Sequence, residues 1–156
     1  MKERVYIETS IISYLTARDS RDVVQLAKQQ LTREWWAMER EWYRVVIGQT
    51  VLEEIRSGAS EAAEKRLAVV KGLIILPLTV DALQLAQELV SARLIPVNAA
   101  ADAYHICAAA IHEVDFLLTW NCSHINNPHT LGRISELISY NGFKAPTITT
   151  PELLRR

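Results

Sequence analysis

The stretch Val5-Tyr6-Ile7-Glu8-Thr9-Ser10 constrains the fold more than any other part of this sequence. Three β-prone residues lead into an acid, and two hydroxyl residues then open a segment with helical apolar spacing. This order predicts a buried strand that ends at Glu8 and a helix that begins near Thr9 or Ser10. Ligands of open parallel sheets collect outside the carboxyl ends of the strands. The acid therefore gains significance if other acids converge on the same edge.

Helices and strands alternate through the rest of the chain. Further strands are predicted over residues 44–49, 73–76, 114–120 and 147–149, and the main helices over residues 21–42, 50–57, 60–71, 79–92, 98–110 and 131–140. Such alternation favours a parallel sheet with helices on both faces. The expected fold is a three-layer α/β/α sandwich around a mainly parallel sheet of four to five strands, in a single domain spanning residues 1–156.

Composition excludes several classes of protein. Hydrophobic residues make up 49% and charged residues 22% of the 156 positions, as in ordinary globular proteins. The net charge of −1 gives no overall attraction to a polyanion, so an RNA partner would need a local basic patch or a bound metal ion. Two cysteines make no disulfide scaffold, and no apolar run reaches the ~18 residues of a membrane span. A cytoplasmic location without membrane contact is expected.

Two adjacent acids follow the second predicted strand. Thr50 and Glu53 fit a capping box, in which Thr50 caps the helix and Glu53 reaches back to it. Glu54 has no such local role and lies about one turn into the helix. Glu53 is therefore interpreted as structural and Glu54 as available for function.

Asp102 lies near the start of the alanine-rich helix that Asn98 is expected to cap. A surface acid that complements the helix dipole is one explanation of Asp102. The face that it shares with His105 is otherwise apolar, however, so the acid is expected to have a partner. His105 itself is interpreted as a packed, hydrogen-bonded histidine rather than a catalytic base.

The strand over residues 114–120 has an acid at its start and an amide after its end. At ~3.3 Å per residue, Asp115 lies well over 10 Å from the carboxyl edge, which makes it a poor site candidate and Asn121 a good one. Glu8, Glu54, Asp102 and Asn121 are thus the four polar residues expected at this edge. Clustered carboxylates repel one another, and their oxygens suit Mg²⁺ or Mn²⁺. Cys122 and His124 supply too few ligands for zinc.

Four motifs follow one another along nearly the whole chain. They are Val5-Tyr6-Ile7-Glu8-Thr9-Ser10, Val51-Leu52-Glu53-Glu54-Ile55 with Gly58, Ala101-Asp102-Ala103-Tyr104-His105-Ile106 with Ala108, and Phe116-Leu117-Leu118-Thr119-Trp120-Asn121 with His124-Ile125. In this order and spacing they resemble PIN domains, most of all the VapC-type toxin ribonucleases of bacterial toxin–antitoxin pairs. The first family acid is usually Asp where this chain has Glu8, and the fourth is commonly Asp where it has Asn121.

The resemblance implies metal-dependent hydrolysis of RNA phosphodiester bonds with Mg²⁺ or Mn²⁺. Glu8 and Asp102 would be the principal metal ligands, and Glu54 would bind metal or orient the attacking water. Asn121 would hold a water on the metal or a phosphate. Ser10 and Thr119 would contact ligands or phosphate, or serve as helix cap and strand-end hydroxyls.

The resemblance also implies two protein partners. A cognate antitoxin is expected near the long tryptophan-bearing helix. A homodimer is expected too, with Trp35, Trp36, Trp42 and Tyr43 as contributors, although most large aromatic side chains belong to the core.

Three other functions compete with the nuclease. A catalytically weak or inactive PIN-like module that binds RNA or protein is the main alternative, and Asn121 favours it because it adds no charge. A phosphatase with a strand-end Asp nucleophile matches poorly, since Glu8, Thr9 and Ser10 occupy the relevant positions. A dinucleotide-binding enzyme is disfavoured because no glycine-rich loop follows the first strand.

Overall fold

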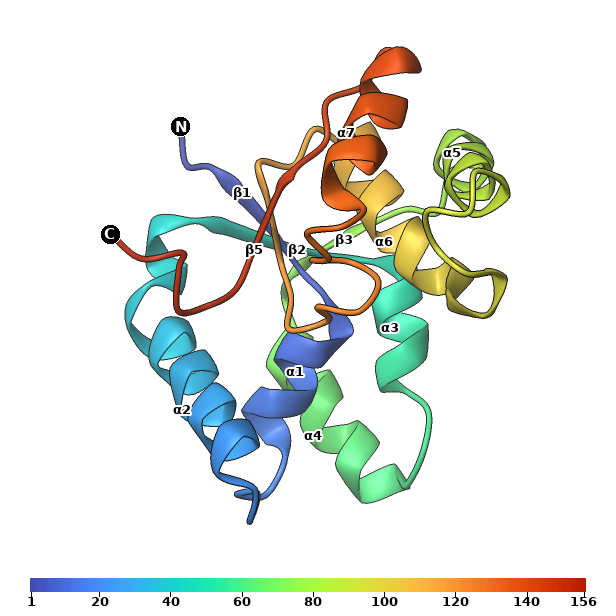
Figure 1. Cartoon of the computed structure of the whole chain (residues 1–156). Coiled ribbons are helices and arrows are strands. Elements are labelled where there is room, and N and C mark those ends of the chain that lie inside the picture. Colours follow the sequence, from blue (N-terminus) through green and yellow to red (C-terminus); the bar gives the residue numbers. More distant parts are fainter.

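The computed structural model describes all 156 residues. Its elements, drawn in Figure 1, are β1 (Arg4–Ile7), α1 (Thr9–Thr16), α2 (Val23–Met38), a 3₁₀ turn η1 (Arg40–Trp42), β2 (Arg44–Gly48), α3 (Gln49–Ile55), α4 (Ser60–Val70), β3 (Ile74–Leu76), α5 (Val80–Ser91), a 3₁₀ turn η2 (Val97–Ala99), α6 (Ala100–Ile111), β4 (Phe116–Leu118), α7 (Leu131–Tyr140) and β5 (Thr147–Thr149). None of the helices is both long and apolar enough to cross a lipid bilayer.

All five strands are parallel and lie in the order β3-β2-β1-β4-β5. Central β1 pairs with both neighbours, so that Val5 lies opposite Val45 on one side and Phe116 on the other. The chain moves outward from β1 to β3 and then returns to place β4 on the opposite side of β1. This reversal opens a crevice at the carboxyl ends of β1 and β4, where ligands of such sheets bind.

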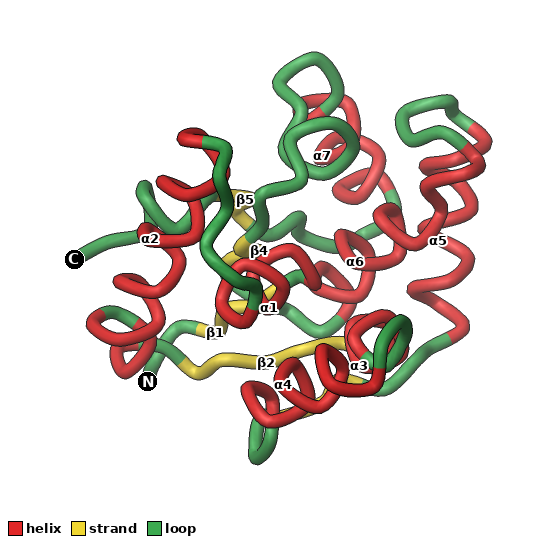
Figure 2. Tube along the Cα trace, turned by 90° about the horizontal axis from the view of Figure 1, so that it is seen from below, coloured by secondary structure: helices red, strands yellow, loops and turns green.

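The fold is an α/β sandwich, as the alternation of elements predicts. Figure 1 shows α1, α2 and α4 below the sheet and α5, α6 and α7 to its upper right. From below, α3 and α4 lie side by side (Figure 2). One cluster of 35 buried apolar residues links the layers, and Val5, Tyr6 and Ile7 of β1 lie fully buried within it. An apolar run buried on both faces is typical of a central parallel strand.

The predicted start of α1 is confirmed. Glu8 is its N-cap residue, and the Glu8 side chain accepts a hydrogen bond from the backbone N–H of Ser10 at 3.1 Å. Glu8 is thus the single residue between the end of β1 and the start of α1. Its carboxylate is fixed beside the crevice by helix capping.

The predicted capping box at Thr50 and Glu53 is wrong. Helix α3 begins one residue earlier, at Gln49, with Gly48 as its N-cap and no side-chain cap. Thr50 therefore lies inside the helix, and Glu53 is exposed. The helix follows β2 directly, so the strand end rather than a side chain sets its first residue.

Two further expectations were wrong because the sequence does not show strand order or helix rotation. The continuous apolar run over residues 73–76 predicts a buried strand, but β3 is an edge strand, and Ile74 and Ile75 are 47% and 44% exposed. In α2, helical spacing predicts one stripe made of Val23, Leu26, Gln30, Trp35, Met38 and Trp42. Of these only Trp35 is buried, together with Gln29 and Thr32.

Candidate functional site

A pocket of about 500 Å³ lies at the carboxyl ends of β1 and β4. The four residues expected at this edge all line it: Glu8, Glu54, Asp102 and Asn121. They come from the end of β1, the last turn of α3, the first turn of α6 and the segment after β4. A larger hollow of about 690 Å³ beside Asp115 contains none of the four.

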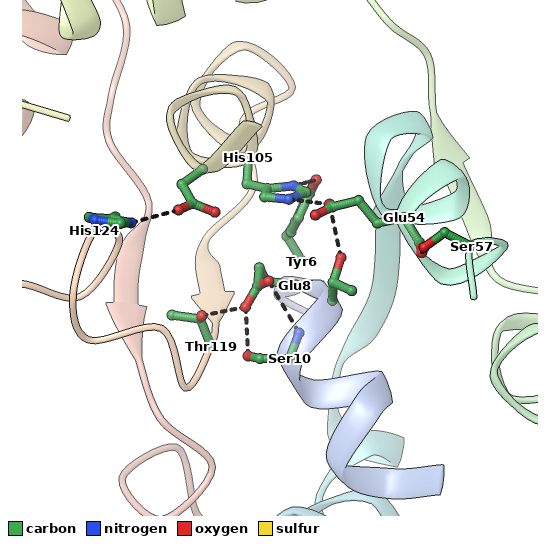
Figure 3. Close-up of polar contacts among 10 residues, drawn as sticks. Tyr6, Glu8, Ser10, Glu54, Ser57, His105, Thr119 and His124 are labelled. Carbon is green, nitrogen blue, oxygen red and sulfur yellow. Dashed lines mark hydrogen bonds and ion pairs between the residues drawn. The ribbon is translucent and has the colours of Figure 1, made fainter. Parts of the chain in front are cut away.

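Glu8 is a buried carboxylate held entirely by neutral donors. Only 5% of the residue is exposed. Its Oε1 accepts hydrogen bonds from the hydroxyls of Thr119 and Ser10, both at 2.6 Å, and its Oε2 accepts the Ser10 N–H (Figure 3). No Lys, Arg or His side chain forms an ion pair with it. Burial of an unpaired carboxylate is unfavourable, so Glu8 is a position where a cation would be stabilising.

The hydroxyls of Ser10 and Thr119 form part of the support of Glu8. The Ser10 Oγ also accepts the backbone N–H of Trp120 at 2.9 Å, which ties the start of α1 to the end of β4. The Thr119 Oγ1 accepts the backbone N–H of Asn121 at 2.9 Å. Both hydroxyls thus contact Glu8, one of the expected metal ligands. Ser10 is not the cap of α1, because Glu8 occupies that position, whereas Thr119 also serves as a strand-end hydroxyl.

Glu54 is joined to a buried histidine and a buried tyrosine. Its Oε1 lies 2.6 Å from Nε2 of His105 and accepts the Thr9 hydroxyl at 3.0 Å. The Nδ1 of His105 lies 2.7 Å from the Tyr6 hydroxyl, and both rings are fully buried (Figure 3). The hydroxyl of Ser57 donates to the Glu54 carbonyl at 2.7 Å and closes the end of α3.

These contacts determine the protonation states of Glu54 and Tyr6. Burial by itself would raise the pKa of Glu54, but His105 and the Thr9 hydroxyl stabilise the carboxylate, and together they lower the pKa below its usual 4.5. Burial raises the pKa of Tyr6, and the nearby charges of Glu54 and Glu8 raise it further. Glu54 is therefore ionised and Tyr6 protonated near neutral pH.

Asp102 has the partner that its apolar helix face suggested, but the partner comes from the segment after β4. The Asp102 Oδ2 lies 3.0 Å from Nδ1 of His124. Asn121 uses its amide oxygen to accept the His124 backbone N–H at 3.0 Å, which fixes the turn that carries the histidine. The amide NH₂ of Asn121 makes no hydrogen bond within the chain and lies at the pocket.

The donor set matches a divalent cation in charge and in chemistry. Three carboxylates line the pocket, and no Lys or Arg does. Glu54 Oε2 and Asp102 Oδ1 carry no hydrogen bond within the chain, and Glu8 Oε2 accepts only one, so each carboxylate keeps free lone pairs. No three His, Cys, Asp or Glu side chains lie close enough together to enclose an ion as they stand. The residues fit Mg²⁺ or Mn²⁺ by type, and binding would require the carboxylates to draw together.

Sequence reasoning did not identify Tyr6, Thr9 and His124 as parts of this site. Tyr6 belongs to a buried strand, where an aromatic residue is ordinarily core. His124 lies 22 residues beyond its partner Asp102. A hydroxyl-bearing tyrosine in a fully apolar central strand was the signal available, because a buried hydroxyl needs a polar partner.

Three solved structures share this architecture. VapC20 from Mycobacterium tuberculosis, described as a sarcin–ricin-loop-cleaving toxin, superposes with a TM-score of 0.58 at 15% identity, over 80% of this chain and 95% of that one. The chain has the PIN-domain fold of VapC proteins. VapBC2 of Rickettsia felis, bound to a DNA fragment from its promoter, gives 0.55 at 16% identity over 94% and 98% of the two chains. VapBC-1 of nontypeable Haemophilus influenzae gives 0.57 at 13% over 96% and 98%.

The likeness to VapC structures is one of fold. No family model matches the sequence, and no curated protein matches it significantly. Support for a catalytic activity of this chain therefore comes from the residues of the pocket.

Proposed function

We propose that residues 1–156 form one PIN-like domain that cleaves RNA with the help of a divalent cation, as the toxin of a toxin–antitoxin pair of the VapC type. The convergence of Glu8, Glu54 and Asp102 on one pocket at the crevice of a VapC fold carries the proposal. Clustered carboxylates without a Lys or Arg in the same pocket repel one another, and a shared cation would offset that repulsion.

In this proposal Glu8 and Asp102 are the principal ligands of Mg²⁺ or Mn²⁺, and Glu54 either completes the set or orients the attacking water. When bound, the cation lowers the pKa of a water and offsets the charge that develops on the phosphate. The Asn121 amide NH₂ would donate to a phosphate oxygen. Ser10 and Thr119 would keep Glu8 in position, through the hydrogen bonds described above.

The pocket wall also offers one aromatic side chain for a nucleobase. Tyr14 is half-buried and lines the pocket, whereas Trp120 beside it is only 8% exposed, and the two rings meet edge to face at 6.3 Å. Trp120 is fixed by a 2.7 Å hydrogen bond from its Nε1 to Thr32. Aromatic rings beside a phosphate site are typical of proteins that bind single-stranded nucleic acid, which supports RNA as the substrate.

The decisive experiment measures cleavage of a fluorescently labelled single-stranded RNA pool by purified protein with Mg²⁺, with Mn²⁺ and with EDTA. We expect cleavage with either ion, none with EDTA, and none with Asp102→Asn, whose fold should remain intact by circular dichroism. Glu53→Gln is the matched control, because Glu53 is exposed and outside the pocket. Retained cleavage by Asp102→Asn would overturn the proposal.

A non-catalytic PIN-like module remains the second candidate. Two observations favour it: no three carboxylates enclose an ion as they stand, and Asn121 supplies no charge and uses its oxygen in a turn. The same experiment separates the two functions. Tight RNA binding without cleavage at any concentration of Mn²⁺ would select the binding module.

The VapC fold also supports two protein partners. We propose a cognate antitoxin, in line with the VapBC complexes that share the fold, and a homodimer. Trp35 and Tyr43 cannot take part in a dimer as proposed from the sequence, because both lie in the core. Trp42, which is 55% exposed, remains available for such a contact.

A further inference from the structure

The contacts behind Glu54 form a chain of buried polar groups that leads away from the pocket. From Glu54 it passes to Nε2 of His105 at 2.6 Å, through the ring to Nδ1, and on to the Tyr6 hydroxyl at 2.7 Å (Figure 3). His105 and Tyr6 are both 0% exposed, so neither can contact RNA or solvent. They can influence the reaction only through Glu54.

We propose that Tyr6 and His105 are positioning residues: the Tyr6 hydroxyl fixes the orientation of the His105 ring, which in turn holds Glu54 with one oxygen bound and the other turned to the cation. This inference rests on the proposed function, because it assigns how that site prepares one of its three carboxylates.

The geometry determines where the ring protons lie. A bare imidazole nitrogen 2.6 Å from a carboxylate oxygen would place two lone pairs against each other, so Nε2 must carry a proton. In the neutral ring Nδ1 is then an acceptor, and the Tyr6 hydroxyl can donate to it.

The contact between Nε2 of His105 and Oε1 of Glu54 is close but is not aligned as a good hydrogen bond. The buried Nε2 has no acceptor in good geometry, although Glu54 is close to it. A buried donor without an aligned acceptor is unfavourable, so His105 draws the carboxylate toward itself. The Thr9 hydroxyl binds the same oxygen from the other side. Both anchors act on Oε1 and leave Oε2 free.

The fold makes room for this arrangement at Gly48. A Cβ atom at that position would lie 2.4 Å from the Tyr6 hydroxyl oxygen. Gly48 has an extended backbone with φ −89°, which any residue can adopt. Its lack of a side chain is therefore required by the Tyr6 hydroxyl and not by the backbone.

The test measures Mn²⁺ affinity by titration calorimetry in the wild type and in Tyr6→Phe, which lacks the Tyr6 hydroxyl. Groups that orient metal ligands typically cost roughly 10- to 100-fold in affinity when removed, and we expect Tyr6→Phe to weaken Mn²⁺ binding within that range. Tyr104→Phe is the matched control. Tyr104 is also buried and adjacent to His105 in sequence, but its hydroxyl takes no part in the contacts that join Tyr6, His105 and Glu54 and should not affect Mn²⁺ binding.

Two histidine variants separate positioning from packing. In His105→Gln the side-chain NH₂ can reach Glu54 and should restore most of the affinity, whereas His105→Leu fills the space without a donor and should not. The double variant Tyr6→Phe/His105→Leu leaves no polar atom unpaired between the two positions. It should therefore fold while still binding Mn²⁺ weakly, which excludes misfolding as the cause.

A double-mutant cycle and a spectroscopic measurement complete the test. In a Glu54→Gln background, Tyr6→Phe should weaken Mn²⁺ binding no further, because Tyr6 and His105 affect the cation only by positioning Glu54. Ring ¹⁵N chemical shifts should show His105 protonated at Nε2 in the wild type, and Tyr6→Phe should shift the Nδ1 resonance, because that nitrogen loses its hydrogen bond from the Tyr6 hydroxyl.

The positioning role would be overturned if Tyr6→Phe left the Mn²⁺ affinity unchanged. It would also be overturned if Tyr6→Phe weakened Mn²⁺ binding equally in the wild-type and the Glu54→Gln background. Failure of the proposed function has a different signature. The wild-type chain would then bind no Mn²⁺ and cut no RNA, which would overturn both.

Discussion

At the scale of single residues, the two adjacent acids of α3 differ completely in their surroundings. Glu54 lines the pocket and is anchored by His105 and Thr9, whereas Glu53 is exposed. We expect Glu54→Gln to reduce RNA cleavage at least tenfold, about 1.4 kcal/mol in transition-state stabilisation, and Glu53→Gln to leave cleavage and stability unchanged. Single-turnover assays at saturating Mn²⁺ give this comparison. Equal losses in the two variants would mean that the functional glutamate was assigned wrongly.

The lowered pKa of Glu54 predicts a dependence of stability on pH. A carboxyl whose pKa is lower in the folded chain stabilises the fold above the unfolded-state pKa, near 4.5, and this contribution disappears as the pH falls through the folded-state value. Urea unfolding in EDTA should therefore show the wild type losing its advantage over Glu54→Gln as the pH falls below about 4.5. If the difference in unfolding free energy between the wild type and Glu54→Gln stays unchanged to the lowest pH at which both chains fold, the pKa of Glu54 is not lowered in the folded chain.

Sequence reasoning reached the residues of the pocket but not the contacts between them. Glu8, Asp102 and Asn121 follow strands or open helices at positions that local patterns reveal. The pairing of Asp102 with His124 joins α6 to the segment after β4, and that of Glu54 with His105 joins α3 to α6. Such pairings depend on how elements pack in space, and spacing along a single chain does not contain that information.

At the scale of elements, β1 and the start of α3 are packed together by Tyr6 and Gly48. A Cβ at residue 48 would meet the Tyr6 hydroxyl at 2.4 Å. We expect Gly48→Ala to destabilise the chain by about 1–3 kcal/mol, the usual range for overpacking, as measured by urea unfolding.

Two variants control this prediction. In Gly48→Ala/Tyr6→Phe the clashing oxygen is gone, and part of the stability should return. Gly132→Ala lies in α7 with no atom within 4 Å of the new methyl group, so it should be neutral or stabilising by up to about 1 kcal/mol. A Gly48→Ala chain as stable as the wild type would show that β1 and α3 are packed less tightly than described.

The start of a helix was predictable from the sequence where a side chain caps the helix. It was not predictable where the end of a strand determines the first helical residue. Thr79 caps α5 as its sequence position indicates, with a hydrogen bond from the Ala82 N–H at 3.2 Å. The box proposed at Thr50 matches the same kind of pattern, yet α3 continues directly from β2. A capping motif is evidence for a helix start only when the preceding backbone is free to form the cap.

At the scale of the whole molecule, the buried aromatic residues stabilise the monomer and the exposed ones can serve association. Trp35 is fully buried, stacks on Tyr43 and donates from Nε1 to the Leu154 carbonyl at 2.9 Å, which binds the C-terminal segment to α2. Trp42 is 55% exposed and Met38 is 69% exposed at the same end of α2. We propose that these two side chains contribute to the surface of the proposed homodimer.

Two tryptophan substitutions should therefore have opposite effects. We expect Trp35→Phe to destabilise the chain by about 1–3 kcal/mol, because the Leu154 carbonyl loses its donor and the core loses volume, without changing the oligomeric state. Trp42→Ser should instead shift the sedimentation-equilibrium mass from dimer toward monomer while each protomer keeps its fold. If the wild type sediments as a monomer, or Trp42→Ser as an unchanged dimer, the association surface does not include Trp42.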